Sequence, residues 1–218
     1  MNNLNKEEYK KAKKKFDDEG FIVFENLISS NEVEEYLNAL DPYLKKNIKG
    51  RNNFEGLKTN RIYGLLDKSE IFGKMVTNSV VMQFVRDELG ESALLSALLA
   101  INLMPGETVQ PWHTDDGYVH VEMPHPSFGI SAFWALTDTN KENGATELLP
   151  GSHKWDKSKL AKYIKLDDYQ SEGFWVTIYL KLQRMKKKLL NFQLDHYSSQ
   201  KEHSYTEEEL IILMLLDL

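Results

Sequence analysis

A histidine and an aspartate two residues apart, His113 and Asp115, lie in the run Val109-Gln-Pro-Trp-His-Thr-Asp-Asp-Gly-Tyr118. On an extended segment, residues i and i+2 point to the same face, so the imidazole and the carboxylate can approach one ion. This spacing supplies two of the three ligands of the 2-His-1-carboxylate facial triad. Such a triad holds non-haem Fe(II) and leaves positions open for oxygen and a co-substrate. We therefore predict His113 and Asp115 as catalytic metal ligands.

A His-x-Asp pair alone is weak evidence, because on the order of a third of chains of this length would contain one by chance. The context strengthens it: prolines at positions 105 and 111 bracket a loop, and functional sites favour loops at strand ends. Asp116 competes with Asp115 as the ligand, but the i, i+2 spacing favours Asp115. Three nearby histidines are interpreted as surface or structural residues: His120, His125 and His153.

Composition restricts the class of protein. The 218 residues are expected to form one domain, and 41% hydrophobic with 28% charged residues is ordinary for a globular protein. The net charge of −6 argues against nucleic acid or an anionic membrane as the main partner. The absence of cysteine excludes disulfides and thiolate metal sites. No secretory signal and no apolar run of about 20 residues is visible. We expect a cytoplasmic protein with a small-molecule substrate, and the sequence predicts no oligomeric state.

The elements that must position the pair follow from hydrophobic periodicity and turn residues. Helices are predicted over 6–18, closed by Gly20, and from Ser29 or Ser30 to about Leu44, with further helical spacing over 72–89. Strands are predicted over 21–24, 94–103 and 128–136, with a tight turn at 143–144 and β signals throughout 105–150. Residues 45–57 form a polar loop. Helices followed by a β-rich half indicate an α+β fold whose sheet carries the site.

Several segments together resemble the phytanoyl-CoA dioxygenase family of Fe(II)/2-oxoglutarate oxygenases. They are Ala100-Ile-Asn-Leu-Met-Pro-Gly-Glu-Thr-Val-Gln-Pro-Trp-His-Thr-Asp-Asp-Gly-Tyr118, Ser131-Ala-Phe-Trp-Ala-Leu-Thr-Asp138, Glu142-Asn-Gly-Ala-Thr-Glu-Leu-Leu-Pro-Gly-Ser-His-Lys154, Gly20-Phe-Ile-Val-Phe-Glu-Asn-Leu-Ile-Ser29 and Asn60-Arg-Ile-Tyr-Gly-Leu-Leu66. The likeness covers about residues 8–160, in order and at family spacing. It implies a double-stranded β-helix, or jelly roll, with N-terminal helices packed on one side.

The resemblance also implies roles for individual residues. His113 and Asp115 match the first two iron ligands, and Trp134, Leu99 and Arg61 fall where the family contacts 2-oxoglutarate. Without the resemblance, Trp134 would be interpreted as a core aromatic residue. The implied reaction consumes O2 and 2-oxoglutarate at Fe(II), with ascorbate as an optional reductant. It releases succinate and CO2 and hydroxylates an aliphatic C–H of a small substrate.

Residues from about 167 to 218 depart from the family pattern. The family closes with a Gly-Ser strand, a His-Gly-Gly-Gly-Ala-Asn-like segment bearing the distal iron ligand, and an arginine that pairs with the far carboxylate of 2-oxoglutarate. No arginine follows Arg184, and His196 and His203 are only weak candidates for the third ligand. The final run, 211–218, is apolar, shows neither strand alternation nor a helix cap, and is not typical of the close of a β domain.

A shift of one base in the reading frame would account for this departure, and we state it as a hypothesis. In the shifted frame, residues 205–211 can encode His-Gly-Gly-Gly-Ala-Asn, and residues 192–198 can encode Pro-Ala-Gly-Ser-Leu-Phe. Both matches fall in one frame and in family order, which places the shift upstream of about Met185. The C-terminal strands would then be incomplete, with exposed edges and weak iron binding.

Three functional interpretations remain open. The first is a family-like hydroxylase, which could be inactive in this particular chain. The second is a non-catalytic, truncated jelly roll that binds a metal or a small ligand weakly. The third is a cupin-like metal isomerase, which needs further ligands near His113, with His120 and Glu122 as candidates. The substrate cannot be deduced, and the loops 47–57 and 119–128 are expected to select it.

Overall fold

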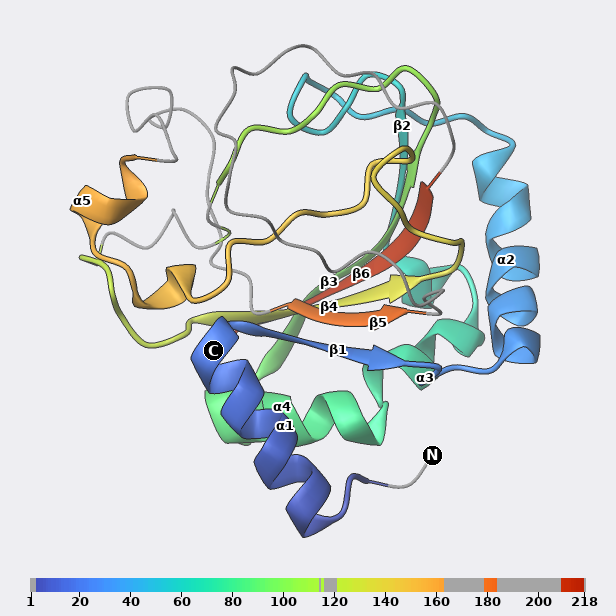
Figure 1. Cartoon of the computed structure of the whole chain (residues 1–218). Coiled ribbons are helices and arrows are strands. Elements are labelled where there is room, and N and C mark those ends of the chain that lie inside the picture. The colour runs from blue at the N-terminus through green and yellow to red at the C-terminus, as the bar shows by residue number, and fades with distance from the viewer. Residues whose placement is uncertain (1–2, 114, 116–120, 163–178, 184–208, 218) are drawn as a thin grey trace.

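The strands of the protein form a single six-stranded sheet, shown in Figure 1. This computed structural model describes residues 3–113, 115, 121–162, 179–183 and 209–217. The strands are β1 (Phe21–Glu25), β2 (Thr59–Tyr63), β3 (Leu94–Leu103), β4 (Gly129–Ala135), β5 (Tyr179–Gln183) and β6 (Glu209–Asp217). The α-helices are α1 (Lys6–Glu19), α2 (Ser30–Leu44), α3 (Gly73–Val76), α4 (Ser79–Leu89) and α5 (Lys157–Leu160). Short 3-10 turns are η1 (Leu65–Asp67), η2 (Glu70–Phe72) and η3 (Ser152–Lys154).

The order of the strands across the sheet is β1-β5-β4-β6-β3-β2. The pairs β2–β3, β3–β6 and β6–β4 are antiparallel, whereas β5 runs parallel to both β1 and β4. The sheet therefore combines segments from the two ends of the chain, and its two edge strands, β1 and β2, both come from the first third of the sequence.

The last strand corrects the interpretation of the C-terminal run. Residues 211–218 were not expected to close a β domain, but β6 pairs along its length with β3 on one side and β4 on the other. The strand thus lies inside the sheet and is paired along both of its edges. Met214 of this strand is fully buried. The expectation that the run 211–218 does not close a β domain is thus wrong for residues 211–217.

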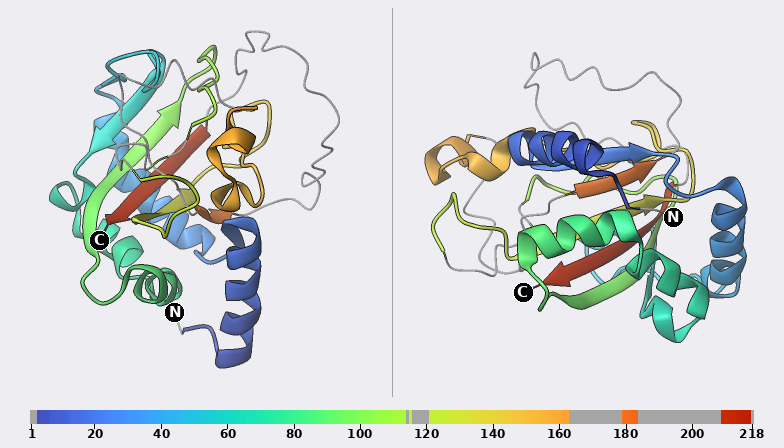
Figure 2. Two further views of the ribbon diagram at one scale, coloured as in Figure 1. Left: turned by 90° about the vertical axis from the view of Figure 1, so that its left-hand side faces the viewer. Right: turned by 90° about the horizontal axis from the view of Figure 1, so that it is seen from below.

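The main hydrophobic core lies between the sheet and the helices. Figure 2 shows α4 lying across one face of the sheet, with α1 beside it near the β1 edge. Phe84 of α4 is the centre of an aromatic group, with ring contacts to Tyr9, Phe16 and Phe24 at centroid distances of 5.1, 5.2 and 5.8 Å. These contacts join α1 and β1 to α4.

Capping residues account for where the first two helices begin. The Asn5 side chain accepts hydrogen bonds from the backbone of Glu7 and Glu8, and Ser29 accepts one from Glu32, each as part of a reciprocal capping box. These boundaries confirm the predicted helices, and they settle the choice between Ser29 and Ser30 in favour of Ser29. Among the described residues, no helix is both long and apolar enough to cross a bilayer.

The C-terminal end of α1 is closed by residues far away in the sequence. Gly20 ends the helix in the left-handed conformation, with φ of 83°. The Gly151 N–H donates to the Glu19 carbonyl at 2.8 Å, and the His153 ring donates through Nε2 to the Asp17 carbonyl at 3.0 Å. His153 is therefore structural, as expected from the sequence, and burial lowers its pKa.

Replacing Gly20 with alanine is expected to lower the free energy of unfolding by about 2–4 kcal/mol, because the new Cβ is strained at positive φ and overlaps the His153 ring. Urea unfolding of the purified chain measures the effect. Gly73→Ala is the matched control, since Gly73 has right-handed helical geometry and open space around it. This control is expected to change stability by less than about 1 kcal/mol, in the stabilising direction. Equal effects of the two substitutions would contradict the role assigned to Gly20.

Candidate functional site

The His113 and Asp115 side chains lie close together in the segment that follows β3. His113 Nε2 and Asp115 Oδ1 are 3.3 Å apart. The two side chains are 19% and 15% exposed, so both are largely shielded but can still be reached by a small ligand. The structure therefore brings together the pair that the His-x-Asp spacing predicts.

A backbone contact determines which nitrogen of the neutral His113 ring carries the proton. Its Nδ1 lies 2.8 Å from the carbonyl oxygen of Pro111. A carbonyl oxygen can only accept, so Nδ1 must carry the proton, and Nε2 faces Asp115 with its lone pair when the ring is neutral. Metal-ligating histidines commonly have this arrangement, in which one ring nitrogen donates to a carbonyl and the other binds the ion.

Burial and proximity shift the pKa values of both groups. Burial raises the pKa of the Asp115 carboxyl above its ordinary range, and His113 only partly opposes this. Burial alone would lower the pKa of His113, but the hydrogen bond to Asp115 and the charge of its carboxylate outweigh this effect and raise it. The pair thus holds a proton more tightly than isolated side chains do.

The donor geometry fits a divalent cation. Two atoms bound to an ion at about 2.1 Å and at right angles are about 3.0 Å apart, close to the separation of the two donor atoms found here. Imidazole and carboxylate are also ligands that suit Fe(II). Within the described residues, however, no cluster of three His, Cys, Asp or Glu side chains forms a complete site. The other candidates His120, His196, His203 and Asp116 lie outside the described residues, whereas Glu122 is described and exposed.

The face of the sheet opposite the main core carries a second apolar cluster. Leu99 and Ile101 of β3 pack there with Phe133 and Ala135 of β4. Directly paired residues of adjacent antiparallel strands share a face. Arg61 pairs with Ile101, and Tyr63 pairs with Leu99, so both belong to this face as well. We call it the inner face. It unites two of the three residues that the resemblance assigns to 2-oxoglutarate, Leu99 and Arg61.

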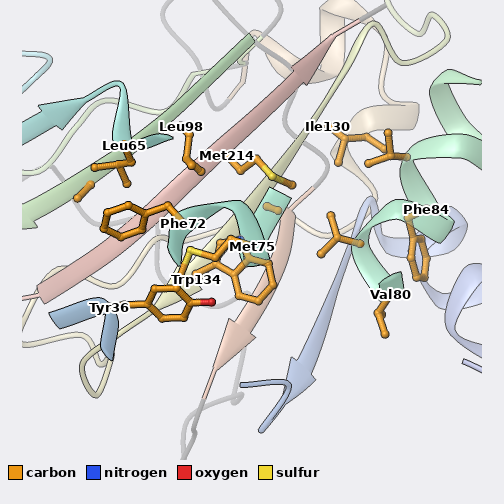
Figure 3. Close-up of a cluster of buried hydrophobic side chains, with 14 of the residues drawn as sticks. Tyr36, Leu65, Phe72, Met75, Val80, Phe84, Leu98, Ile130, Trp134 and Met214 are labelled. Carbon is orange, nitrogen blue, oxygen red and sulfur yellow. The ribbon is translucent and has the colours of Figure 1, made fainter. Parts of the chain in front are cut away.

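Trp134 lies on the opposite face of the sheet from Leu99 and Arg61. Its side chain is fully buried in the main core, as Figure 3 shows, near Met75 and Tyr36. Successive residues of a strand point to opposite faces, so Trp134 and its neighbour Phe133 belong to different clusters. Phe133 lies on the inner face, together with Leu99 and Ile101.

Arg61 is a partly buried cation within this region. Desolvation by burial lowers its pKa, although nothing in the normal pH range would deprotonate it. Its Nε donates a hydrogen bond of 2.8 Å to the Glu55 carbonyl oxygen. The Glu55 carboxylate is itself paired with Arg51, whose hydrogen bond lowers the Glu55 pKa to about 2. Arg61 therefore lies near the Glu55 carboxylate but forms no direct ion pair with it.

Glu107 is a buried carboxylate that the sequence analysis missed. It accepts hydrogen bonds from the Lys58 backbone at 2.6 Å and from the Thr59 hydroxyl at 2.9 Å, both through Oε2, and from Thr108 N at 2.8 Å. These bonds fix the turn after β3 against the start of β2. The sequence signal for this role was the position of Glu107 directly after Pro105 and Gly106. Gly56 is required beside it, because a Cβ at φ of 91° would overlap Thr59 and Glu107.

His125, the remaining described histidine of the group, does not join the pair. Its Nδ1 lies 2.9 Å from the Pro126 carbonyl oxygen, and its ring lies against Phe128 at a centroid distance of 5.1 Å. His125 is thus engaged locally, in agreement with its interpretation from the sequence.

Comparison with curated proteins finds a series of dioxygenases. The chain is 29% identical over 160 residues to the dioxygenase FUM3 of Gibberella moniliformis, covering 65% of this chain and 53% of that protein. It is 30% identical over 146 residues to the ectoine dioxygenase of Streptomyces coelicolor, covering 63% and 48%. The chain thus spans about half the length of the curated relatives it matches.

Solved structures with a similar fold are oxygenase-related enzymes. HygX from Streptomyces hygroscopicus, crystallised with nickel and 2-oxoglutarate, matches with a TM-score of 0.60 at 14% identity, over 98% of this chain and 87% of HygX. SnoN, a non-haem α-ketoglutarate-dependent epimerase from nogalamycin biosynthesis, matches with a TM-score of 0.60 at 14% identity, over 95% and 81%. At these identities the likeness establishes the mixed α and β fold.

The family assignment rests on a match that covers more of the chain than the match to either relative does. Residues 16–214 match the phytanoyl-CoA dioxygenase family, a span that contains the His113–Asp115 pair and extends through most of β6. The relatives and the structural neighbours are consistent with it, and so is the geometry of the pair. The chain belongs to the phytanoyl-CoA dioxygenase family.

Proposed function

We propose that this chain is a dioxygenase that uses Fe(II) and 2-oxoglutarate to hydroxylate an aliphatic C–H of a small organic molecule. The observation that carries the proposal is the convergence of His113 Nε2 and Asp115 Oδ1, held by the Pro111 carbonyl, in a chain of this family. Bound iron would supply the activation of O2, coupled to oxidative decarboxylation of 2-oxoglutarate. As part of the same proposal, residues 1–218 form one domain, and the sheet is one wall of a double-stranded β-helix.

The residues of the site have separate roles in this proposal. His113 and Asp115 hold the metal ion. Arg61 on the inner face is the partly buried cation suited to a carboxylate of 2-oxoglutarate, since a guanidinium can bind a carboxylate through two hydrogen bonds. Leu99 and Phe133 give the apolar wall that excludes water from that interaction. The third metal ligand has to come from outside the described residues, where His196 and His203 are candidates.

A non-catalytic role is the second candidate, and one observation favours it. The strand β6 lies in the middle of the sheet but has the sequence Glu-Leu-Ile-Ile-Leu-Met-Leu-Leu-Asp, with no basic residue. It therefore brings no cation to the centre of the sheet to pair with a second carboxylate. Under this proposal the chain binds a metal or a small ligand weakly and does not turn over.

Succinate release decides between the two. The full chain is incubated with Fe(II), ascorbate, O2 and 2-oxoglutarate, and succinate is quantified with and without EDTA. The first proposal expects succinate that disappears with EDTA and in His113→Ala. The second expects no succinate but Ni(II) binding that depends on His113. If neither succinate nor metal binding is found, both proposals fail.

The reading-frame hypothesis has its own test. Sequencing of the coding DNA from Gly151 onwards either restores a His-Gly-Gly-Gly segment followed by an arginine or leaves the present sequence in place. A restored segment supports the catalytic proposal for the corrected protein and confines the non-catalytic one to this chain.

A further inference from the structure

The His113 imidazole meets an aromatic ring from a distant part of the chain. The centroids of the Phe54 and His113 rings are 4.9 Å apart, with an angle of 71° between the planes. Edge-to-face packing of this kind stabilises a ring in one orientation more than a simple apolar contact does. Phe54 belongs to the 50–57 loop, which precedes β2, and its side chain is half-buried.

Hydrogen bonds to two consecutive backbone carbonyls hold the loop that presents Phe54. The Gln110 side chain donates to the Phe54 carbonyl at 2.6 Å, and Arg61 Nε donates to the Glu55 carbonyl at 2.8 Å. One donor comes from the segment that carries His113, and the other comes from the inner face. The loop is also fixed internally, since Asn52 accepts from Glu55 N at 2.8 Å.

These contacts restrict the imidazole from two directions. The Pro111 carbonyl holds Nδ1, and the Phe54 ring packs against the side of the imidazole. Rotation about the side-chain torsions would have to break the first contact or displace the second. Since the described residues contribute only two metal ligands, the affinity of the site depends strongly on how well those two are oriented.

We propose that Phe54 is a positioning residue for the metal-binding imidazole of His113, and that the 50–57 loop couples this ring to Arg61. This inference rests on the proposed function, because it assumes that His113 binds a metal ion. Arg61 and the His113 ring are then linked through adjacent residues of one loop, Phe54 and Glu55. An anion that engages Arg61 would thereby act on the orientation of the metal ligand.

Titration calorimetry of the full chain with Ni(II) at fixed pH tests the proposal. Phe54→Ala is expected to weaken Ni(II) binding about 10-fold or more, the usual effect of removing a residue that orients a ligand. Phe54→Tyr retains the ring and is expected to restore the affinity of the unmodified chain. Leu57→Ala is the matched control in the same loop, because Leu57 is 53% exposed, and it is expected to leave the affinity unchanged.

A second readout separates positioning from folding. The nitrogen-15 resonances of the histidine side chains at fixed pH, without metal, are expected to move for His113 in Phe54→Ala but not for His153. If Phe54→Ala and the unmodified chain bind Ni(II) equally while His113→Ala does not bind, the positioning role is wrong and the proposed function stands. If His113→Ala binds as well as the unmodified chain, the metal site itself is wrong. Should Phe54→Ala unfold, Gln110→Ala provides the same test, with a weaker expected loss of affinity.

Discussion

Replacement of Trp134 with alanine is expected to lower the free energy of unfolding by about 3–5 kcal/mol, the usual cost of deleting a large aromatic side chain from a core. The indole is fully buried among side chains of the sheet and the helices, so its removal leaves a cavity that rigid strands cannot close. Trp134→Phe is expected to cost much less, about 1.5 kcal/mol at most. The buried indole N–H has no hydrogen-bond partner within the described structure, so phenylalanine removes an unsatisfied donor together with some volume.

The Trp134 variants also test which face of the sheet binds 2-oxoglutarate. The affinity for 2-oxoglutarate, measured by calorimetry with Ni(II) present, is expected to be unchanged in Trp134→Phe. It is expected to fall in Phe133→Ala, which truncates an aromatic residue on the inner face. Urea unfolding of each variant provides the stability. A folded Trp134→Phe chain that loses 2-oxoglutarate binding while Phe133→Ala retains it would reverse the assignment of the two residues.

Replacement of Asp115 with alanine is expected to weaken divalent metal binding by about 100-fold or more, since loss of an outer residue that only orients a ligand already costs 10–100-fold. Asp115 is the single carboxylate that lies against His113 Nε2 within the described residues. The measurement is Ni(II) calorimetry on the full chain, with His113→Ala expected to show a loss of the same order.

Glu122→Gln is the informative control for this experiment. Glu122 is acidic, exposed and close in sequence to Asp115, and it is a candidate ligand only under the cupin-like interpretation. We expect it to leave Ni(II) affinity unchanged. A loss in Glu122→Gln comparable to that in Asp115→Ala would favour a site with extra carboxylates over a facial triad.

The local elements could be predicted from the sequence because their signals are local. Asn5 and Ser29 begin helices, Gly20 ends one, and the strands near residues 21, 94 and 129 are short apolar runs bounded by turns. The helical spacing over 72–89 was correct in type, but the structure divides it into α3 and α4. Among the described residues of 105–150, the segment 129–135 is the only strand, so part of the β signal there came from turn residues.

The parts that could not be predicted depend on contacts between distant residues. The pairing of β6 with β3 and β4 could not be predicted, because it joins backbone segments that are far apart in the sequence. Phe54 has no motif that connects it with His113, and Glu107 is recognisable only from its bonds to Lys58 and Thr59. The pair itself was predictable because i, i+2 geometry is a property of any extended segment. The choice between Trp134 and Phe133 required the register of the strand.

The central place of β6 has a consequence for how the chain reaches its native state. Strands β3 and β4 are both synthesised long before Glu209–Asp217, yet each pairs with that last strand, and they do not pair with each other. During synthesis the part of the sheet that carries β2 and β3 keeps an unpaired edge until residues 209–217 have emerged. Such a large sequence separation between paired strands slows folding and prolongs the exposure of strand edges. Ribosome-bound chains of this protein are therefore expected to depend on chaperones until β6 has emerged.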